Sequence, residues 1–229
     1  MALPEEAKTL GLKHAKPLSL HKLNATVTVA VCGAGSENAA RASRELLSAG
    51  SRHLMSFGTA AGLKEEADVG CLVIPNHVLM EDVDLPVDVA WRKEIIRRID
   101  ERHNSGKLLA LTSISQTRQK QELGKQVNCL AGDMESGAVA AYCRENNLPF
   151  SVIRVVVDDV NTAIPSVVTD ALDENGMVSL GKLFSGLLLK PWQIIALVSL
   201  ARKFARAKRV LSSVAMRLAP DFAVVDRLS

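Results

Sequence analysis

Two acidic residues stand where they could share the chemistry of one bond cleavage. Glu135 lies in the segment Asp133-Met134-Glu135-Ser136, at the start of a predicted helix of small residues. Asp158 follows residues 150–157, an apolar run that predicts a buried strand. One carboxylate at the start of a helix and one at the end of a strand can divide charge stabilisation and proton donation between them. This is the chemistry needed to cleave a glycosidic bond to a purine.

Each acid also has a structural explanation. An acid in the first turn of a helix, such as Glu135, complements the helix dipole and needs no catalytic purpose. Asp158 could simply begin a turn after its strand, as aspartate often does. Taken singly, each residue is better explained in this way, and only their combination indicates catalysis.

Strands and helices alternate along the chain, which predicts a largely parallel sheet with helices on both faces. Strands are predicted at 26–32, 52–57, 70–79, 107–112 and 150–157, and helices at 37–49, 88–101, 133–147 and 180–218, with a short helix or loop at 116–124. A chain of 229 residues with 48% apolar side chains can bury one full core. We therefore expect a single α/β domain over residues 1–229, a twisted mixed sheet flanked by helices.

Two turns rich in small residues follow the first two predicted strands. Gly33-Ala34-Gly35 precedes a helix whose first backbone N–H groups could hold an anion. It is not a dinucleotide fingerprint, because Asn38 stands at the third glycine position. The second predicted turn, residues 56–63, adds the hydroxyl of Thr59. Together the turns predict a binding crevice, and the alternative is that both are ordinary connections.

Composition excludes several classes of function. The four cysteines show no CxxC spacing and the five histidines form no metal-binding pattern, so we expect neither a disulfide nor a metal site. Aromatic residues make up only 3% of the chain, which leaves no stacking platform for single-stranded nucleic acid. The first residues lack a basic segment followed by an apolar core, so we expect a cytoplasmic protein.

Three motifs resemble one enzyme superfamily in their order and spacing. They are residues 58–63 (Gly-Thr-Ala-Ala-Gly-Leu), Asp133-Met134-Glu135 and residues 153–158 (Ile-Arg-Val-Val-Val-Asp). The superfamily is that of the nucleoside phosphorylases and nucleosidases, which includes the methylthioadenosine/S-adenosylhomocysteine nucleosidases. Within it, residues 88–92, 133–136 and 180–218 look most like the hopanoid-biosynthesis-associated phosphorylases. Those proteins are understood to remove adenine from adenosylhopane.

The resemblance implies a role for each candidate site residue. Glu135 matches the acid that binds the ribose hydroxyls and steadies the positive charge on the sugar, and Asp158 matches the acid that acts on purine N7. Because Asp158 must be protonated to donate, we expect burial to raise its pKa. Glu6 matches the acid near the nucleophile. The implied substrate-binding residues are Gly33, Gly35, Gly58, Thr59, Ala61, Met134 and Arg154.

The acceptor of the ribosyl group can be phosphate or water. The subfamily resemblance favours inorganic phosphate as a co-substrate and implies no other cofactor. Ser56 stands where phosphate-using relatives often place an arginine, so water stays an alternative acceptor. Only five residues precede Glu6, where relatives usually have a strand. If the sheet lacks that strand, Glu6 is expected to be poorly placed.

The expected activity is cleavage of the N-glycosidic bond of an adenosyl lipid, adenosylhopane, with release of adenine. Two alternatives stay open. One is a nucleosidase for methylthioadenosine or S-adenosylhomocysteine, and the other is a nucleoside-binding protein that has lost catalysis. The resemblance also implies a homo-oligomer, in the simplest case a dimer.

The last helical segment is strongly basic. Residues 180–219 carry eight Lys or Arg and no Asp or Glu, alongside apolar residues such as Phe184, Leu188, Trp192 and Ile195. The first interpretation is an amphipathic helix pair whose apolar face packs on the core. The second is peripheral contact with an anionic membrane, because cations and exposed apolar side chains bind such a surface together.

Overall fold

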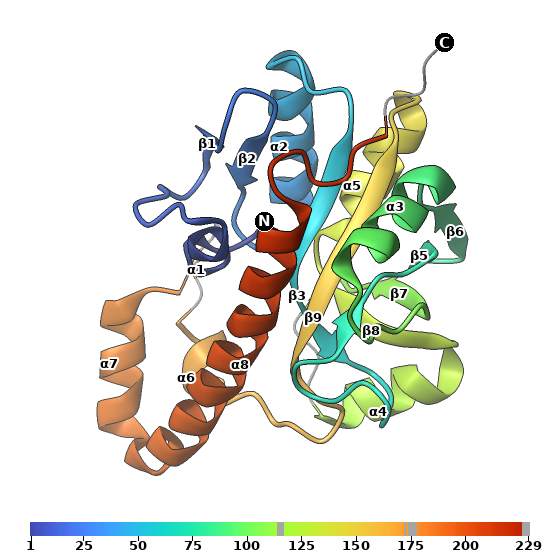
Figure 1. The fold of residues 1–229 in the computed structure, drawn as a ribbon. Coiled ribbons are helices and arrows are strands. Elements are labelled where there is room, and N and C mark those ends of the chain that lie inside the picture. Colours follow the sequence, from blue (N-terminus) through green and yellow to red (C-terminus); the bar gives the residue numbers. More distant parts are fainter. Residues whose placement is uncertain (114–116, 172, 174–177, 226–229) are drawn as a thin grey trace.

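A seven-stranded sheet forms the centre of the computed structural model, which describes residues 1–113, 117–171, 173 and 178–225 (Figure 1). The strands lie in the order β4-β9-β3-β8-β7-β5-β6. Their bounds are β3 Leu54–Gly62, β4 Leu72–Val73, β5 His77–Met80, β6 Val83–Pro86, β7 Lys107–Ala110, β8 Cys129–Asp133 and β9 Phe150–Asp158. The expected α/β fold with a mixed sheet is confirmed.

Strands β3 and β9 form the backbone of this sheet. They run parallel from the pair Leu54–Phe150 to the pair Ala61–Asp158, with a register shift just before the last pair. Strand β8 pairs with β7 in parallel and meets the end of β3 in the antiparallel sense. The edge strands β4 and β6 are both antiparallel to their neighbours. The carboxyl ends of β3 and β9 therefore lie side by side, which is where a mixed α/β sheet binds ligands.

Helices cover both faces of the sheet (Figure 1). Helix α8 (Ile194–Leu218) lies along β9 and contacts α3 (Val89–Ile99), whereas α2 (Ser36–Ser48) packs against α5 (Ser136–Glu145), which contacts β3, β5 and β7. The shorter elements are α1 Pro4–Ala7, η1 Lys8–Leu10, α4 Thr117–Gln126, α6 Ser166–Thr169, α7 Leu180–Leu189 and η2 Pro191–Gln193.

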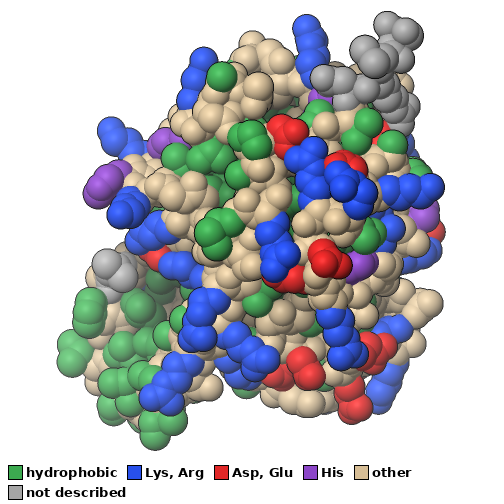
Figure 2. All heavy atoms as spheres, viewed as in Figure 1, with side chains coloured by type: hydrophobic (Ala, Val, Ile, Leu, Met, Phe, Trp, Pro, Cys, Tyr) green, Lys and Arg blue, Asp and Glu red, His purple; other side chains and the backbone are tan. Residues whose placement is uncertain are grey.

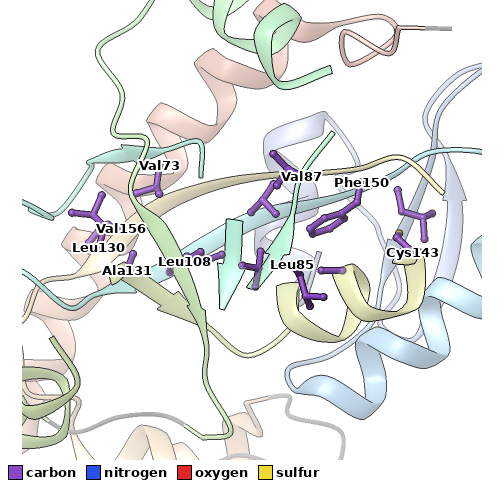
Figure 3. Close-up of a cluster of buried hydrophobic side chains, with 14 of the residues drawn as sticks. Val73, Leu85, Val87, Leu108, Leu130, Ala131, Cys143, Phe150 and Val156 are labelled. Atoms are coloured by element: carbon purple, nitrogen blue, oxygen red, sulfur yellow. The ribbon is translucent and has the colours of Figure 1, made fainter. Parts of the chain in front are cut away.

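Each face of the sheet has its own apolar core. On one face, apolar side chains from the strands and from the residue after β6 meet α5, among them Val87, Leu108, Phe150 and Val156 (Figure 3). On the other face, Phe57, Ile153 and Val155 pack with residues of α3 and α8. Strand β9 contributes to both cores, because alternate residues of a strand point to opposite faces. Its continuous apolar sequence follows from this burial on both sides.

Strands β1 (Ser19–Lys22) and β2 (Thr28–Val31) form a separate antiparallel pair. A cavity of about 460 Å³ lies between β2 and β3 and is lined on these two sides by Thr26–Ala30 and by residues of 52–57. Trp91 and Phe222 also line it. The cavity walls include none of the predicted site residues, so this space is not the predicted crevice.

Three predicted elements differ from the structure. The expected strand at 70–79 is two strands, β4 and β5, which lie at separate places in the sheet. The expected turn at 56–63 is mostly strand, because β3 continues through Gly62. The expected helix 133–147 begins only at Ser136, and residues 129–133 form a strand, β8, that the pattern did not indicate. All five residues of β8 are buried, so this short run, which includes Gly132, carries no alternating pattern of apolar and polar residues.

The packing of α4 on the end of β3 depends on a glycine. A Cβ at Gly124 would lie 2.0 Å from the backbone oxygen of Leu63, whereas a Cβ at Gly181 in α7 would have no heavy atom within 4 Å. We predict that Gly124→Ala lowers the free energy of unfolding by about 1–3 kcal/mol through overpacking. Gly181→Ala should be neutral or stabilising by up to about 1 kcal/mol, because alanine favours helix. Urea denaturation of both variants checks this, and equal stabilities would contradict the close approach of α4.

Candidate active site

Arg154, in the middle of β9, is a buried cation held by carboxylates. Its side chain is 1% exposed. Its Nε lies 2.5 Å from Oδ2 of Asp133, and its Nη2 lies 3.5 Å from Oε2 of Glu135. Both partners are buried as well. A guanidinium in such a place requires close carboxylates and further hydrogen bonds to offset its loss of water.

Two serines supply those further hydrogen bonds. Nη2 of Arg154 donates to Oγ of Ser56 at 2.7 Å and to Oγ of Ser136 at 3.1 Å. The Ser136 hydroxyl donates to Oδ2 of Asp133 at 2.5 Å, and the hydroxyl oxygens of the two serines lie 2.9 Å apart. Ser56 comes from β3 and Ser136 from the first residue of α5. The guanidinium therefore ties together β9, β3 and the first residue of α5.

Asp133 fixes the junction between β8 and α5. Its Oδ1 accepts hydrogen bonds from the backbone N–H groups of Glu135 at 3.1 Å and Ser136 at 2.8 Å, while Oδ2 faces Arg154. An aspartate that bonds the backbone two and three residues later sets a tight turn. This turn makes Glu135 the residue that precedes α5 and places its side chain beside β9.

Glu135 lies between the first glycine turn and Arg154. Its Oε1 accepts a hydrogen bond from the backbone N–H of Gly35 at 3.0 Å. Gly35 has φ of +102°, a conformation that favours glycine, and this exposes its N–H toward the carboxylate. Burial raises the pKa of Glu135 to about 7, and the nearby Arg154 guanidinium opposes this rise.

Glu6 is not poorly placed. Its carboxylate is buried at 1% exposure and accepts four hydrogen bonds. Oε2 accepts from the backbone N–H groups of Ala2 and Leu3, and Oε1 accepts from the N–H of Thr59 at 2.8 Å and its hydroxyl at 2.9 Å. Four accepted bonds fill the lone pairs of a carboxylate. The few residues before Glu6 thus suffice to hold it.

Gly58 allows the two charged groups to approach. A Cβ at this position would lie 2.6 Å from Nη1 of Arg154 and 2.7 Å from Oε1 of Glu6. Nη1 of Arg154 donates to the backbone oxygen of the next residue, Thr59, at 3.2 Å. The carboxylate and the guanidinium therefore converge on the space beside β3 that a side chain at position 58 would occupy.

Asp158 forms a second buried pair, with Lys120 of α4. The Lys120 side chain is fully buried, and its ammonium donates to Oδ2 of Asp158 and to the backbone oxygens of Asp159 at 3.1 Å and Thr162 at 3.0 Å. Burial raises the pKa of Asp158 to about 6, as expected from its place in the sequence, although Lys120 lowers it. The carboxyl group can therefore hold a proton near neutral pH.

The two charged centres lie on one strand. Arg154 and Asp158 are four residues apart in β9, which places their Cα atoms about 13 Å apart at about 3.3 Å per residue. The register shift of β9 against β3 falls just before Asp158, which pairs with Ala61. Such a bulge redirects a side chain at the end of a strand.

The remaining predicted residues lie around these centres. Gly33 has φ of +82° and donates its N–H to the backbone oxygen of Ala2 at 3.0 Å. Met134 is partly buried between β8 and α5. Within the described residues, no group of three His, Cys, Asp or Glu side chains is arranged to hold a metal ion. The functional roles of the predicted residues stay predictions.

Sequence reasoning missed Lys120. It lies in Thr117–Gln126, a helix of low hydrophobicity in which it is the buried residue. Lys125 of the same helix is exposed, and no local pattern separates the two lysines. The contacts of Ser56 and Ser136 with Arg154 could not be predicted either, because no sequence spacing marks a hydroxyl that binds a guanidinium.

Comparison with known proteins places this geometry in context. The family model for the phosphorylase superfamily matches residues 2–189. A curated 5'-methylthioadenosine/S-adenosylhomocysteine nucleosidase from Staphylococcus aureus (strain JH9) is 27% identical over 130 residues, covering 47% of this chain and 57% of that protein. The chain thus matches little more than half the length of this relative.

Solved structures share the fold at lower identity. The 5'-methylthioadenosine/S-adenosylhomocysteine nucleosidase from Neisseria meningitidis, in complex with methylthio-immucillin-A, has a TM-score of 0.69 at 17% identity and covers 95% of both chains. The futalosine hydrolase of Helicobacter pylori strain 26695 has a TM-score of 0.61 at 15% identity, covering 93% of this chain and 94% of its own.

We predict that Arg154→Met lowers the free energy of unfolding by about 3–5 kcal/mol, because it leaves buried carboxylates without a countercharge. Without Arg154, the pKa of Glu135 rises further, because the guanidinium no longer favours the carboxylate. The folded state then binds more protons than the unfolded state, so the loss of unfolding free energy becomes smaller as the pH falls. Arg97→Met is the matched control and should change the stability little, because Arg97 is 71% exposed in its pair with Glu94. Urea denaturation at about pH 6 and about pH 8 measures the stabilities of both variants. Equal losses of unfolding free energy in Arg154→Met and Arg97→Met would contradict the buried ion pair.

Proposed function

Because the chain belongs to the phosphorylase superfamily, we propose that it cleaves the N-glycosidic bond of an adenosyl nucleoside and releases adenine. One observation carries this proposal. The cluster pairs the guanidinium of Arg154 with the buried carboxylates of Asp133 and Glu135, and the buried carboxylate of Glu6 lies close enough to interact with it electrostatically. Its charge is therefore negative where a cationic sugar would form.

The charge of the cluster suits the expected transition state. Cleavage of a glycosidic bond passes through an oxocarbenium-like sugar that carries positive charge. Fixed carboxylates in a buried site stabilise such a charge more strongly than water does, because they need no reorganisation. Glu135 is the carboxylate best placed for this role, since its Oε1 faces the Gly35 turn while Arg154 holds Oε2.

Asp158 is proposed as the proton donor to the leaving base. An adenine that leaves carries negative charge unless a proton reaches its ring, and N7 is the nitrogen that the resemblance assigns. With a pKa of about 6, Asp158 is partly protonated near neutral pH. Lys120 limits that fraction, because its ammonium favours the carboxylate form. Lys120 is thus proposed as a positioning residue that sets the pKa of the acid.

The geometry favours water over phosphate as the acceptor. Both donors of Thr59, the backbone N–H and the hydroxyl, already bond Oε1 of Glu6. A phosphate at this place would need those donors and would face three carboxylates against one guanidinium. Phosphorolysis, which the subfamily resemblance favours, therefore requires both bonds to break. A water needs only one acceptor position of Glu6 to be freed, and the carboxylate of Glu6 would take the proton that the water loses when its oxygen bonds the sugar.

The substrate is proposed to be an adenosine with a bulky 5′ substituent. The curated relatives are named for 5'-methylthioadenosine and S-adenosylhomocysteine, both adenosines substituted at this carbon. The subfamily resemblance points to an adenosyl lipid, adenosylhopane, and we retain it as the first candidate. The sulfur-containing nucleosides are the second. A homodimer remains a prediction of the same resemblance.

We predict that the protein releases adenine from these substrates, and that Glu135→Gln and Asp158→Asn each lower kcat by at least about 10²-fold, the scale of a positioned charge or acid. Glu122→Gln and Asp170→Asn are matched controls, because both side chains are largely exposed. Chromatography of free adenine, with and without inorganic phosphate, measures the rates. A stimulation by phosphate would refute hydrolysis, and no adenine under any condition would leave only nucleoside binding.

The pH profile offers a separate prediction. Glu135 must be ionised to stabilise the sugar and Asp158 protonated to donate, so kcat/KM should peak near pH 6.5, midway between their pKa values of about 7 and about 6. Lys120→Gln removes the charge that lowers the pKa of Asp158, so the descending limb should move to higher pH. Lys125→Gln is the control, because Lys125 lies on the same helix as Lys120 but is exposed. Identical profiles in the two variants would contradict the role of Lys120.

A further inference from the structure

The bend between α7 and α8 carries a large exposed apolar surface. Seven side chains there are between 44% and 84% exposed, and we name this set the elbow patch: Phe184, Leu188, Leu189, Trp192, Ile194, Ile195 and Val198. Figure 2 shows apolar atoms gathered on the projecting hairpin at the lower left of the molecule. Contiguous exposed apolar surface of this kind marks an interaction site.

The elbow patch is not an unfinished core, because the helix that carries it is already anchored. The second half of α8 buries Ala207, Leu211, Val214 and Leu218 against the sheet and α3. The expectation of an amphipathic helix on the core is correct for this half only. The first half of α8 and the whole of α7 extend beyond the sheet (Figure 1).

None of the described helices has, by itself, the length and apolar character of a transmembrane span. Residues Gly181–Leu189 and Pro191–Leu218 have them only when taken together, and these two segments are bent by 112°.

Cations surround the elbow patch. Lys182 precedes it, and Arg202, Arg206 and Arg209 follow it along α8, all of them exposed. The sequence has no acidic residue from 180 to 219. A protein partner with an apolar groove would not require this excess of positive charge. An anionic bilayer meets both features at once, because lysine and arginine bind its headgroups while apolar side chains enter between them.

We propose that the elbow patch docks this protein on the surface of an anionic phospholipid bilayer. The apolar side chains at the bend, led by Leu188, Trp192 and Ile195, enter the headgroup region to a depth of about 5–10 Å. Trp192 lies at the bend itself, in the 3-10 turn η2, and tryptophan favours the interface between water and lipid. The arginines of α8 contact the headgroup phosphates.

The elbow also connects to the loop that follows Asp158. Gln193 accepts a hydrogen bond from the N–H of Val167 and donates to Ser166, and Lys190 donates to Ser166 at 2.9 Å. Farther along α8, Lys203 pairs with Asp159. A docked elbow would thus hold this edge of the sheet against the lipid, where the 5′ group of an adenosyl lipid would emerge. Only this last step rests on the proposed function.

Vesicle binding tests the docking without any reference to catalysis. The full chain is sedimented with vesicles of phosphatidylcholine alone and of phosphatidylcholine with phosphatidylglycerol, at low and at high salt. We expect binding to the anionic vesicles that salt weakens. The triple variant Leu188→Ser, Trp192→Ser, Ile195→Ser should lose at least about tenfold in vesicle partitioning. The pair Val89→Ser and Met216→Ser is the matched control, because both side chains are exposed elsewhere.

Fluorescence adds a local readout. Trp192 is 70% exposed and the other tryptophan, Trp91, is 2% exposed, so brominated lipids should quench Trp192. Failure of the wild type to bind anionic vesicles at low salt would overturn the proposal. So would a lipid-free dimer, seen by light scattering, that the triple variant converts to a monomer without any vesicle binding, since a second copy would then cover the patch.

Cleavage of a soluble adenosine substrate separates the two proposals. The triple variant should retain the wild-type rate on it, because none of its residues contacts the clusters around Arg154 or Asp158. Binding to vesicles without release of adenine would retain the docking surface and reject the enzyme activity. Release of adenine without binding would do the reverse.

Discussion

Arg154 can lie inside a strand buried on both faces only because carboxylates from distant parts of the chain converge on it. Asp133 and Glu135 arrive from the junction of β8 and α5, and Glu6 arrives from the first helix. A buried guanidinium without such partners would be strongly destabilising. The ion cluster therefore fixes how the first helix, β3 and α5 meet, and the geometry of the candidate site is a result of that requirement.

Burial raises the pKa values of both proposed catalytic acids, and their different neighbours give them different chemistry. Both Glu135 and Asp158 have raised pKa values, because little water reaches either side chain. Glu135 sits beside a guanidinium and other carboxylates, whereas Asp158 has one ammonium that is itself held by two backbone oxygens. A negative field at one centre and a proton at the other are what a cationic sugar and a leaving base require. One strand, β9, supplies a residue to each centre and so keeps their separation constant.

The sequence predicted the parts of this arrangement that leave a local pattern. The apolar run of β9 and the helix break at Lys190-Pro191 were found, because burial on both faces and a proline each have a clear signature. Strand β8 was missed because it has only five residues and all of them are buried, so its sequence shows no alternation of apolar and polar side chains. The partner of Asp158 was also missed, since the burial of Lys120 follows from how α4 packs and not from its neighbours in sequence. For the apolar residues of α7, pattern alone could not tell a core face from an exposed one.

The bare backbone of Gly58 has a consequence for how this sequence can change. A larger residue there would meet both Arg154 and Glu6, which lie far from it in sequence on opposite sides. A lineage that kept the ion cluster would therefore be unable to alter position 58, and only a lineage that lost both Arg154 and Glu6 would be released from the constraint on glycine. The three positions should vary together across homologues as a single inherited unit. An alignment in which a bulky residue at position 58 accompanies the loss of both charged residues would carry the record of that coupling.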